Sequence, residues 1–567
     1  MLGFCFGIYY IPFMFVRIKT SKNSPKKAVQ IVESFRTGTK VKQRIVRHVG
    51  TAFDDSEVKK LREVAEFIKA KLETVAQPTL FSPETLTELA IAARNKEPNQ
   101  ETQNVNITDL REEQRIILGI HEIYGKVFDE LGFNNLVSRR KVAARRNLFH
   151  TVMARIANPA SKRHSVLDLA ARFGVDLSLS AVYRMMDSLD SEIVEKIKKR
   201  ACQTANSLLN GKIQVAFYDC TTLYFESFTE GDELLKNGYS KDMKFNQPQV
   251  MLALLTTTDG LPIGYELYPG NTFEGNTLVD AIQRLQKNYE ICRVVFVADS
   301  AMLSQKNIEL LEEQGVEYIV GARLKSMSTK KQNEILAEDT WINTDDSEDD
   351  VSKYKEMKLS NNRRLIVSYN PARARKDSRD RNTTIDKLLK KIKRSKDPLS
   401  LVSNYGYKKF IKVEGKTDIY LDEEKVAQAA QWDGIHGIIS NVQSMEPSQL
   451  RAQYRCLWEI EECFRISKHD LKFRPIFHWT ENRVKAHVAI CFIALVCVRY
   501  LQYQLRVQGL AVSVKKTVRE LLSVQASIVR DTKTKKRYLI PSAITELGHK
   551  IYRKCNKKYN QVPCLLK

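Results

Sequence analysis

Short apolar runs alternate with amphipathic stretches between residues 213 and 314, and this pattern predicts alternating strands and helices. The runs at 213–225, 249–257 and 262–268 are rich in β-branched and aromatic residues and predict strands. The other predicted elements are a helix at 275–289, a strand at 293–298 and a helix at 304–314. Runs as short and apolar as these are typical of strands buried on both faces. We therefore expect an α/β core in this part of the chain.

A different pattern covers residues 454–472 and predicts one long amphipathic helix. This stretch contains no Gly or Pro, and the next Pro is Pro475. Seven residues make about two helical turns, so residues spaced by three, four and seven share a stripe. The polar and aromatic stripe consists of Tyr454, Trp458, Glu461, Arg465 and Lys468, and the apolar stripe beside it of Leu457, Ile460, Phe464 and Leu471. Taken alone, the pattern describes any amphipathic helix that packs on a core.

Two of the predicted core strands carry an aspartate. Asp219 belongs to the strand at 213–225, and Asp299 follows the strand at 293–298. A carboxylate at the end of a buried strand costs free energy unless a positive group or a metal ion stabilises it. A capping or turn Asp is the ordinary explanation for each. Three carboxylates held together would instead need a divalent cation, which is what a two-metal phosphoryl-transfer site requires.

The N-terminal third reads as β-rich and then helical. The first sixteen residues carry no charge and resemble neither a signal peptide nor a membrane span, so we expect the chain to start at Met14. Helices are predicted at 55–75, 111–131 and throughout 139–200, with a polar linker at 76–110. Residues 164–189 fit a helix-turn-helix, with Gly174 in the turn and Ser180 capping the second helix, or a plain helical hairpin. The basic residues of the β-rich part face either phosphates or solvent, and they are Lys26, Lys27, Lys40, Lys42, Arg44 and Arg47.

Composition points to a polyanionic partner. The chain of 567 residues has a net charge of +24, and its length suggests two to four domains. A basic ribosomal or membrane-surface protein would fit the charge alone. The ten cysteines include no Cys-x2-Cys pair, which argues against a zinc site or disulfide framework and fits a reducing cytoplasm. The apolar run at 488–498 has eleven residues, a length that favours a buried core helix over a membrane span.

The most basic stretch lies at residues 363–397. It holds 13 Lys and Arg residues against 4 Asp, a net charge of +9. Such a run is either a solvated helix face or a grip on the DNA backbone. Lys390, Lys391, Lys393 and Arg394 are the candidate contacts in the second case. The acidic loop at 344–350 is more typical of a solvated turn than of a metal site.

These motifs together resemble the DDE transposases of bacterial insertion sequences. The helix resembles the signature Tyr-x2-Arg-x3-Glu-x6-Lys of the cut-and-paste group typified by insertion sequence four. Tyr454, Glu461 and Lys468 match it, whereas Leu457 stands at the Arg position, so the charge would have to come from Arg455 or Arg465. Further fragments resemble the same family: YDCTTLYFE at 218–226, GYSKD at 238–242, GLPIGYELYPGNTFEGNT at 260–277 and FRPIFHW at 473–479.

The resemblance implies an RNase H-like catalytic core that a β-rich insertion interrupts, with N-terminal β-rich and helical DNA-binding regions. Asp219, Asp299 and Glu461 would hold two Mg²⁺ ions, for which Mn²⁺ may substitute, roughly 4 Å apart. The enzyme would cleave the insertion-sequence ends and join them to target DNA, with a hairpin on the element end. Tyr454 and Lys468 would contact end phosphates, with Arg465 beside them, and Trp458 would stack on a base or pack in the core.

The implied partner is double-stranded DNA, both terminal inverted repeats and target, bound by a homodimer in the synaptic complex. No membrane partner is expected, and the location would be the bacterial cytoplasm, at the nucleoid. The alternatives are an RNase H-like nuclease or resolvase without strand transfer, and an inactive DNA-binding protein. The expected divisions of the chain are 1–13 (upstream extension), 14–135 (β-rich and helical), 136–205 (helix-turn-helix-like), 206–325 (core, first part), 326–440 (basic β-rich insertion), 441–505 (core, second part) and 506–567 (basic tail).

Overall fold

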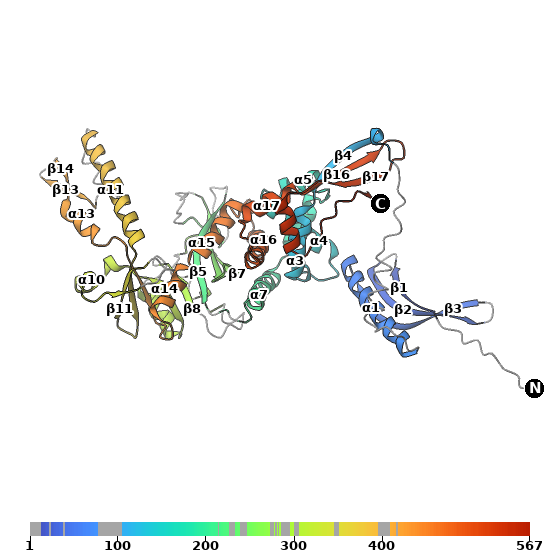
Figure 1. Cartoon of the computed structure of the whole chain (residues 1–567), viewed down its shortest axis with the longest axis horizontal. Helices are drawn as coiled ribbons and strands as arrows, with labels where there is room; N and C mark the ends of the chain where they lie inside the picture. The colour runs from blue at the N-terminus through green and yellow to red at the C-terminus, as the bar shows by residue number, and fades with distance from the viewer. Residues whose placement is uncertain are drawn as a thin grey trace, which may run out of the picture.

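The computed structural model of the chain describes most of its residues (Figure 1). The described ranges are 13–21, 24–37, 40–76, 105–211, 213, 215–225, 233–238, 247–272, 277, 280–281, 283–284, 295–299, 305–344, 351–394, 409–414 and 418–566. Nearly all of the expected upstream extension, most of the polar linker, most of the helix at 275–289 and nearly all of the acidic loop lie outside these ranges.

The N-terminal region is a small β-sheet with one helix. Strands β1 (Phe13–Ser21), β2 (Ser24–Thr37) and β3 (Lys40–Ala52) form a three-stranded antiparallel sheet in sequence order. Helix α1 (Asp55–Ala76) packs on it through Ala65, which shares a buried cluster with Val29 and Ile31. The helix predicted at 55–75 is therefore present almost to the residue.

A helical region follows, and here one sequence-based prediction is wrong. Residues 111–131 form a strand and a helix, β4 (Leu110–Ile117) and α3 (Gly119–Glu130), and not one helix. The strand exists because it pairs with β16 (Gln525–Asp531), more than four hundred residues away in the chain. Four helices then fill the predicted helical stretch: α4 (Val142–Ala157), α5 (Lys162–Phe173), α6 (Leu179–Asp187) and α7 (Ser191–Leu208).

Helices α5 and α6 occupy the predicted helix-turn-helix. Gly174 ends α5 in the left-handed conformation, with φ of 64°, as a turn glycine should. The cap of α6 is Ser178 and not Ser180, because the Ser178 hydroxyl accepts a hydrogen bond from the Ala181 amide. Tyr183 is half-buried and lies under the Arg483 guanidinium, 4.9 Å from its ring centroid, so this residue of α6 packs against the protein.

The centre of the molecule is a nine-stranded sheet in the order β10-β11-β12-β15-β9-β8-β5-β6-β7. Its core strands are β5 (Val215–Tyr224), β6 (Gln249–Thr257), β7 (Pro262–Pro269), β8 (Val295–Ala298) and β9 (Glu317–Gly321), with α9 (Gln305–Glu313) connecting the last two. Strands β5, β6 and β7 form an antiparallel meander, and β8 and β9 add in parallel on the other side of β5. This is the RNase H-like arrangement expected for the core.

The insertion extends this sheet. Strands β11 (Lys353–Lys358), β12 (Arg364–Tyr369) and β15 (Ile435–Ser440) continue it beyond β9, and β10 (Ile342–Asn343) closes the edge. The insertion is less purely β than expected, since it also holds α10 (Thr329–Leu336), α11 (Pro371–Arg394) and α13 (Glu423–Ala430). A separate hairpin, β13 (Ile411–Glu414) and β14 (Asp418–Leu421), packs with α11.

Residues 447–507 return the chain to the core. Helix α14 (Pro447–Arg455) leads into α15 (Trp458–Arg465), a π-helical turn at 466–470 and the long helix α16 (Glu481–Val507). Figure 1 shows α16 between the central sheet and the helical region of α3 and α4. By length and composition α16 could cross a membrane, but 94% of its most apolar 18-residue stretch is buried inside the protein. This burial agrees with the core helix predicted at 488–498.

Residues 506–567, expected as a tail, are folded in large part. They form α17 (Val514–Ser523), β16, β17 (Arg537–Pro541), α18 (Glu546–Lys554) and β18 (Cys564–Leu566). Their strands join β4 in a four-stranded sheet of order β18-β17-β16-β4. The C-terminal residues thus complete the helical region that begins near residue 110. The remaining short helical turns are at Ile107–Asp109, Phe133–Asn135 and Leu324–Ser326.

Candidate active site

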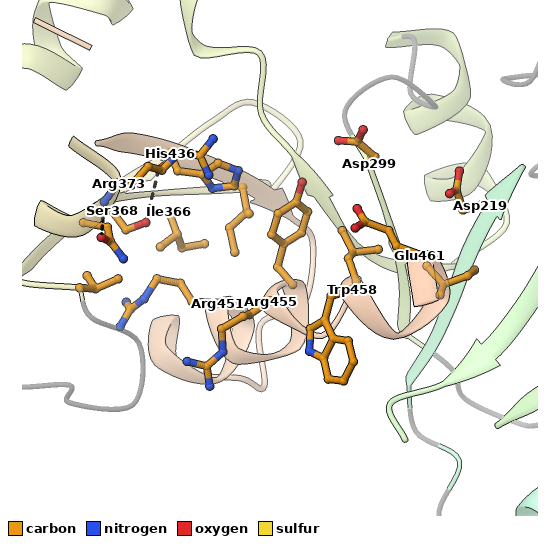
Figure 2. Close-up of a pocket in the computed structure, with 16 residues that line it drawn as sticks. Asp219, Asp299, Ile366, Ser368, Arg373, His436, Arg451, Arg455, Trp458 and Glu461 are labelled. Atoms are coloured by element: carbon orange, nitrogen blue, oxygen red, sulfur yellow. Dashed lines mark hydrogen bonds between the residues drawn. The ribbon is translucent and has the colours of Figure 1, made fainter. Parts of the chain in front are cut away.

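A pocket of about 570 Å³ opens where the core, the insertion and helices α14 and α15 meet (Figure 2). Asp219, Asp299 and Glu461 all line it, so the structure brings the three predicted carboxylates to one place. Figure 2 shows these carboxylates at one end of the pocket and Arg373, Arg451 and Arg455 toward the other. The other lining residues are Val351, Ile366, Ser368, Asn370, His436, Ile438, Tyr454, Leu457, Trp458 and Ile460.

The register of two parallel strands places the two aspartates. Strand β5 pairs with β8 from Val215 opposite Val295 to Phe217 opposite Val297. Asp219 and Asp299 each come two residues after this last pair, so both project from the same face and the same level of the sheet. The prediction of a strand-end position does not hold for Asp219, which lies inside β5, opposite Leu254 of β6. Only β8 ends at this level of the sheet, because β5 continues past it.

The surroundings of the two aspartates differ. Asp219 is half-buried, and its carboxylate accepts a hydrogen bond of 2.7 Å from the backbone amide of Cys220. Asp299 directly follows the fully buried strand β8 and is exposed. A carboxylate that is partly desolvated needs compensation, whereas an exposed one keeps its hydration.

Helix α15 brings Glu461 over this part of the sheet. Its Ile460, Cys463 and Phe464 are buried in the core cluster that also contains Phe217 of β5, while Glu461 is exposed to the pocket. The Cys463 thiol donates to the carbonyl oxygen of Gly260, in the turn between β6 and β7, at 3.4 Å. Apolar packing on one side of the helix therefore fixes the glutamate on the other.

A buried ion pair holds α15 to α16. The side chains of Glu459 and Arg499 are each only 4% exposed and form a salt bridge. Arg499 also donates from Nε to the Gly260 carbonyl oxygen at 2.8 Å, and Arg506 reaches Glu459 Oε1 at 3.2 Å. Because a buried carboxylate must be paired, this network fixes the rotation of α15 and the direction of Glu461.

The long helix predicted at 454–472 is interrupted twice. Helix α14 ends at Arg455, and the Leu457 amide bonds to the Tyr454 carbonyl at 3.1 Å in a tightened turn before α15 begins. After Arg465 the backbone forms a π turn, closed by the Leu471 amide on the Ile466 carbonyl at 2.8 Å. The predicted stripe is therefore not continuous, because each change of winding rotates the residues that follow it.

Only part of the stripe reaches the pocket. Tyr454, Trp458 and Glu461 line it, and Trp458 is 53% exposed. Arg465 instead forms salt bridges with Glu462 at 2.6 Å and Asp470 at 3.3 Å. The Lys468 ammonium lies 5.7 Å from the centroid of the Phe464 ring. Of the two arginines considered for the signature position occupied by Leu457, Arg455 lines the pocket.

The insertion supplies a pocket wall that sequence analysis missed. Arg373 comes from α11 and His436 from β15, and the ring of His436 lies 5.2 Å from that of Tyr454. Burial lowers the pKa of His436 to about 4; Arg373 lowers it too, while Asp299 acts in the opposite direction. Burial also raises the pKa of Tyr454, and Asp299 and Glu461 add to this effect. Arg373, His436 and Tyr454 line the same pocket as the three carboxylates.

The sequence alone did not indicate that Arg373, His436 and Arg451 would line the pocket. Arg373 belongs to the basic run at 363–397, but it was not among the four cations proposed there as DNA contacts. His436 and Arg451 carried no pattern of their own. The four cations that were singled out lie elsewhere on α11: Lys390 and Lys391 are exposed, and the side chains of Lys393 and Arg394 lie outside the described part. Lys390 is seventeen residues from Arg373, roughly 25 Å along a helix.

The donor set of the pocket suits a hard divalent cation. Carboxylate oxygens are the ligands that Mg²⁺ and Mn²⁺ prefer, and the three acidic residues share one end of the pocket. Within the described ranges, however, no three His, Cys, Asp or Glu side chains converge closely enough to form a finished metal site. Asp219, Asp299 and Glu461 therefore match such an ion in the type of ligand atom and share one end of the pocket, but they do not form a closed ligand set.

This combination of a parallel β5–β8 pair, two aspartates and a helical glutamate defines the DDE class of nucleotidyl-transferring enzymes. The model of the transposase DDE domain matches residues 210–497, just over half of the chain, and the chain belongs to this family. The model of the N-terminal domain of IS1634 family transposases matches residues 16–78, which correspond to β1–β3 and α1. The protein is therefore a bacterial insertion-sequence transposase, an enzyme of DNA cleavage and strand transfer. These matches leave the signature of the group typified by insertion sequence four as a prediction.

Solved structures give more distant similarities. The piggyBac transposase synaptic complex with hairpin DNA is 11% identical, with a TM-score of 0.35, over 71% of this chain and 76% of that one. The Mos1 mariner paired-end complex with Mn is 12% identical, with a TM-score of 0.14, over 47% of this chain and 77% of that one. No curated protein sequence matches the chain.

Proposed function

We propose that Asp219, Asp299 and Glu461 hold two Mg²⁺ ions, with Mn²⁺ as a substitute, and that DNA phosphates are cleaved and joined at this position. The observation that carries the proposal is that all three carboxylates line one pocket. When bound, such ions activate an attacking water or 3′-hydroxyl and stabilise the leaving oxygen. The remaining chemistry belongs to the side chains of the pocket.

The other pocket residues position the DNA strand. Arg373, Arg451 and Arg455 present cations at the end of the pocket away from the carboxylates, where they attract the phosphates beside the reacting one. Tyr454 keeps its hydroxyl proton, since burial raises its pKa, and so donates to a phosphate oxygen. Burial lowers the pKa of His436 to about 4, so at physiological pH it is neutral and does not repel a bound cation. Trp458, half exposed at the rim, stacks on a base.

The substrates are the terminal inverted repeats of the element and a target duplex. Lys390, Lys391, Lys393 and Arg394 of α11 bind the DNA backbone, and Arg465 and Lys468 contact DNA outside the pocket. Two copies of the chain act together in the synaptic complex, and the protein works at the bacterial nucleoid. The net charge of +24 supports a DNA partner, since phosphate contacts release counterions.

Single substitutions of the carboxylates test the proposal. Asp219→Asn, Asp299→Asn and Glu461→Gln keep the side-chain shapes, and each should abolish Mg²⁺-dependent cleavage of an end-containing duplex while gel-shift binding persists. Glu462→Gln is a matched control, because Glu462 sits beside Glu461 on α15 but pairs with Arg465. A carboxylate variant that cleaves at the rate of this control would exclude that residue as a ligand.

A further inference from the structure

The segment from Phe473 to Trp479, between the π turn and α16, is fixed against the end of β5. Ile476 forms a parallel bridge with Phe225, and its amide donates to the Tyr224 carbonyl oxygen at 3.1 Å. The Arg474 guanidinium lies 5.3 Å from the centroid of the Tyr224 ring. The segment is thus held by the catalytic sheet through backbone and side-chain contacts.

Side chains in this segment alternate between the core and the surface. Ile476 and His478 point inward, with exposed fractions of 1% and 8%, and the His478 ring contacts the ring of His487 at 5.4 Å. Phe477 and Trp479 are 53% and 63% exposed. Because successive side chains of an extended chain leave on opposite sides, these two aromatic rings face the same way.

Exposed aromatic rings are concentrated in this part of the protein. Among the described residues, the large aromatic side chains with the greatest exposure are Phe67, Tyr420, Trp458, Phe477 and Trp479. Three of these five belong to the stretch from the start of α15 to the start of α16. Two exposed rings on an anchored backbone present an apolar surface to solvent, which is costly in water unless a partner covers it.

The 473–479 segment lies along the same edge of β5 as β8. Ile476 pairs with Phe225 and shares the face of β5 that carries Asp219, so Phe477 and Trp479 project from the opposite face. Strand β8 pairs with that edge of β5 as far as Phe217, and the 473–479 segment pairs with it at Phe225. Asp219 lies between the two, six residues before Phe225, a distance of about 20 Å in a strand. A strand of duplex DNA rises about 3.4 Å per nucleotide and an unpaired strand can extend further, so the rings lie within roughly six nucleotides of a phosphate at Asp219.

We propose that Phe477 and Trp479 form a stacking platform for unpaired nucleobases of DNA that is bound at the carboxylate pocket and passes around this edge of the sheet. This rests on the proposed function of the pocket. The charge beside the rings favours DNA over a second protein chain, because the exposed Lys472 and the half-buried Arg474 flank them and the chain carries +24 overall. Aromatic faces accept any base, so the platform holds opened DNA without reading its sequence.

Binding measured in EDTA tests the platform apart from catalysis. The probes are a blunt 30-base-pair duplex and the same duplex with ten unpaired nucleotides at one end. Phe477→Ala/Trp479→Ala should lower affinity for the forked probe about tenfold or more and barely change the affinity for the blunt probe. Tyr420→Ala is the matched control, since Tyr420 is also 53% exposed but lies on β14 of the insertion. Circular dichroism melting checks that the variants fold.

Tryptophan fluorescence gives a second readout on a protein with an intact platform. Trp479→Phe retains a stacking face and should keep the affinity for the forked probe, but it should lose part of the fluorescence quenching that this probe causes. Equal quenching in both proteins, or unchanged affinity in the folded double variant, would overturn the proposal. An equal loss on blunt and forked probes, or a change of oligomeric state in light scattering, would assign the rings to a protein interface and also overturn it. Normal cleavage by the carboxylate variants would refute the proposed function but leave this result unaffected, because no metal is present.

Discussion

Asp219 and Asp299 lie two residues beyond Phe217 and Val297, which are partners in parallel register on neighbouring strands. Equal offsets from one pair put two carboxylates on the same face of the sheet at the same height. A divalent cation bound there would compensate both negative charges.

Added Mg²⁺ should stabilise the protein through this pair. An ion that binds only the folded state adds about 2.7 kcal/mol at one hundred times its dissociation constant. We expect the melting temperature of the native protein to rise with Mg²⁺ or Mn²⁺ and to fall again with a chelator. Asp219→Asn should respond less to the addition of metal. Differential scanning calorimetry across a metal titration measures both effects, and identical metal responses would rule out this site.

The buried pair of Glu459 and Arg499 should matter for stability far more than an exposed pair. Arg499→Ala leaves the Glu459 carboxylate buried without its main partner, which should cost about 3–5 kcal/mol. Arg483→Ala breaks an exposed salt bridge to Asp187 and should cost about 0–1 kcal/mol. Urea unfolding at pH 7 compares the two variants. If Arg499→Ala is no worse than Arg483→Ala, the network does not hold α15 in place.

Cations of α11 should contribute to DNA binding without specificity. Replacing Lys390, Lys391, Lys393 and Arg394 with Gln should weaken binding to any duplex at low salt. The slope of log affinity against log salt should flatten by roughly 0.9 for each phosphate that the protein no longer neutralises. Preference for element ends over random DNA should barely change, because phosphates carry no base identity. Lys196, Lys199 and Arg200 on α7 provide a control set of exposed cations, and equal slopes for both sets would assign the α11 cations to solvent.

Two partly buried histidines should make the protein sensitive to acid. His121 and His150 lie 3.1 Å apart between ring nitrogens, and burial lowers the pKa of each to about 4. In the unfolded chain they titrate near pH 6.5, so between pH 6.5 and 4 only the unfolded state takes up these protons. The free energy of unfolding should be fully retained above pH 6.5 and fall below it, by up to about 1.4 kcal/mol per pH unit for each histidine. Urea titrations of native protein and His121→Gln at pH 7, 6 and 5 should show a shallower fall in the variant.

The core strands could be predicted because their signal is local. Strand β6 is buried along its whole length, and its run of apolar residues fixed both bounds. Strand β4 could not be recognised in the same way, since its charged sequence LREEQRII becomes a strand only through pairing with β16. The local pattern of residues cannot identify a partner strand that lies hundreds of residues away.

The three carboxylates of the pocket could be predicted from the sequence, whereas the pocket residues supplied by the insertion could not. Asp219 and Asp299 stand out as acids in apolar runs, and Glu461 stands out by its spacing within a known signature. The turn between Tyr454 and Trp458 has no Gly or Pro to announce it, so one helix was the natural expectation. His436 and Arg373 reach the pocket only because β15 pairs with β9 and α11 follows β12, which are relations of tertiary structure.

The continuous sheet also determines when the three carboxylates can come together during translation. Strand β15 pairs with β9 across the entire insertion, and α15 reaches β5 only after that. Contacts of such high sequence separation form late, since a long loop must close first. A nascent chain on the ribosome therefore carries Asp219 and Asp299 for many seconds before Glu461 emerges to join them. Until Glu461 has emerged, that copy of the chain lacks the complete set of three carboxylates.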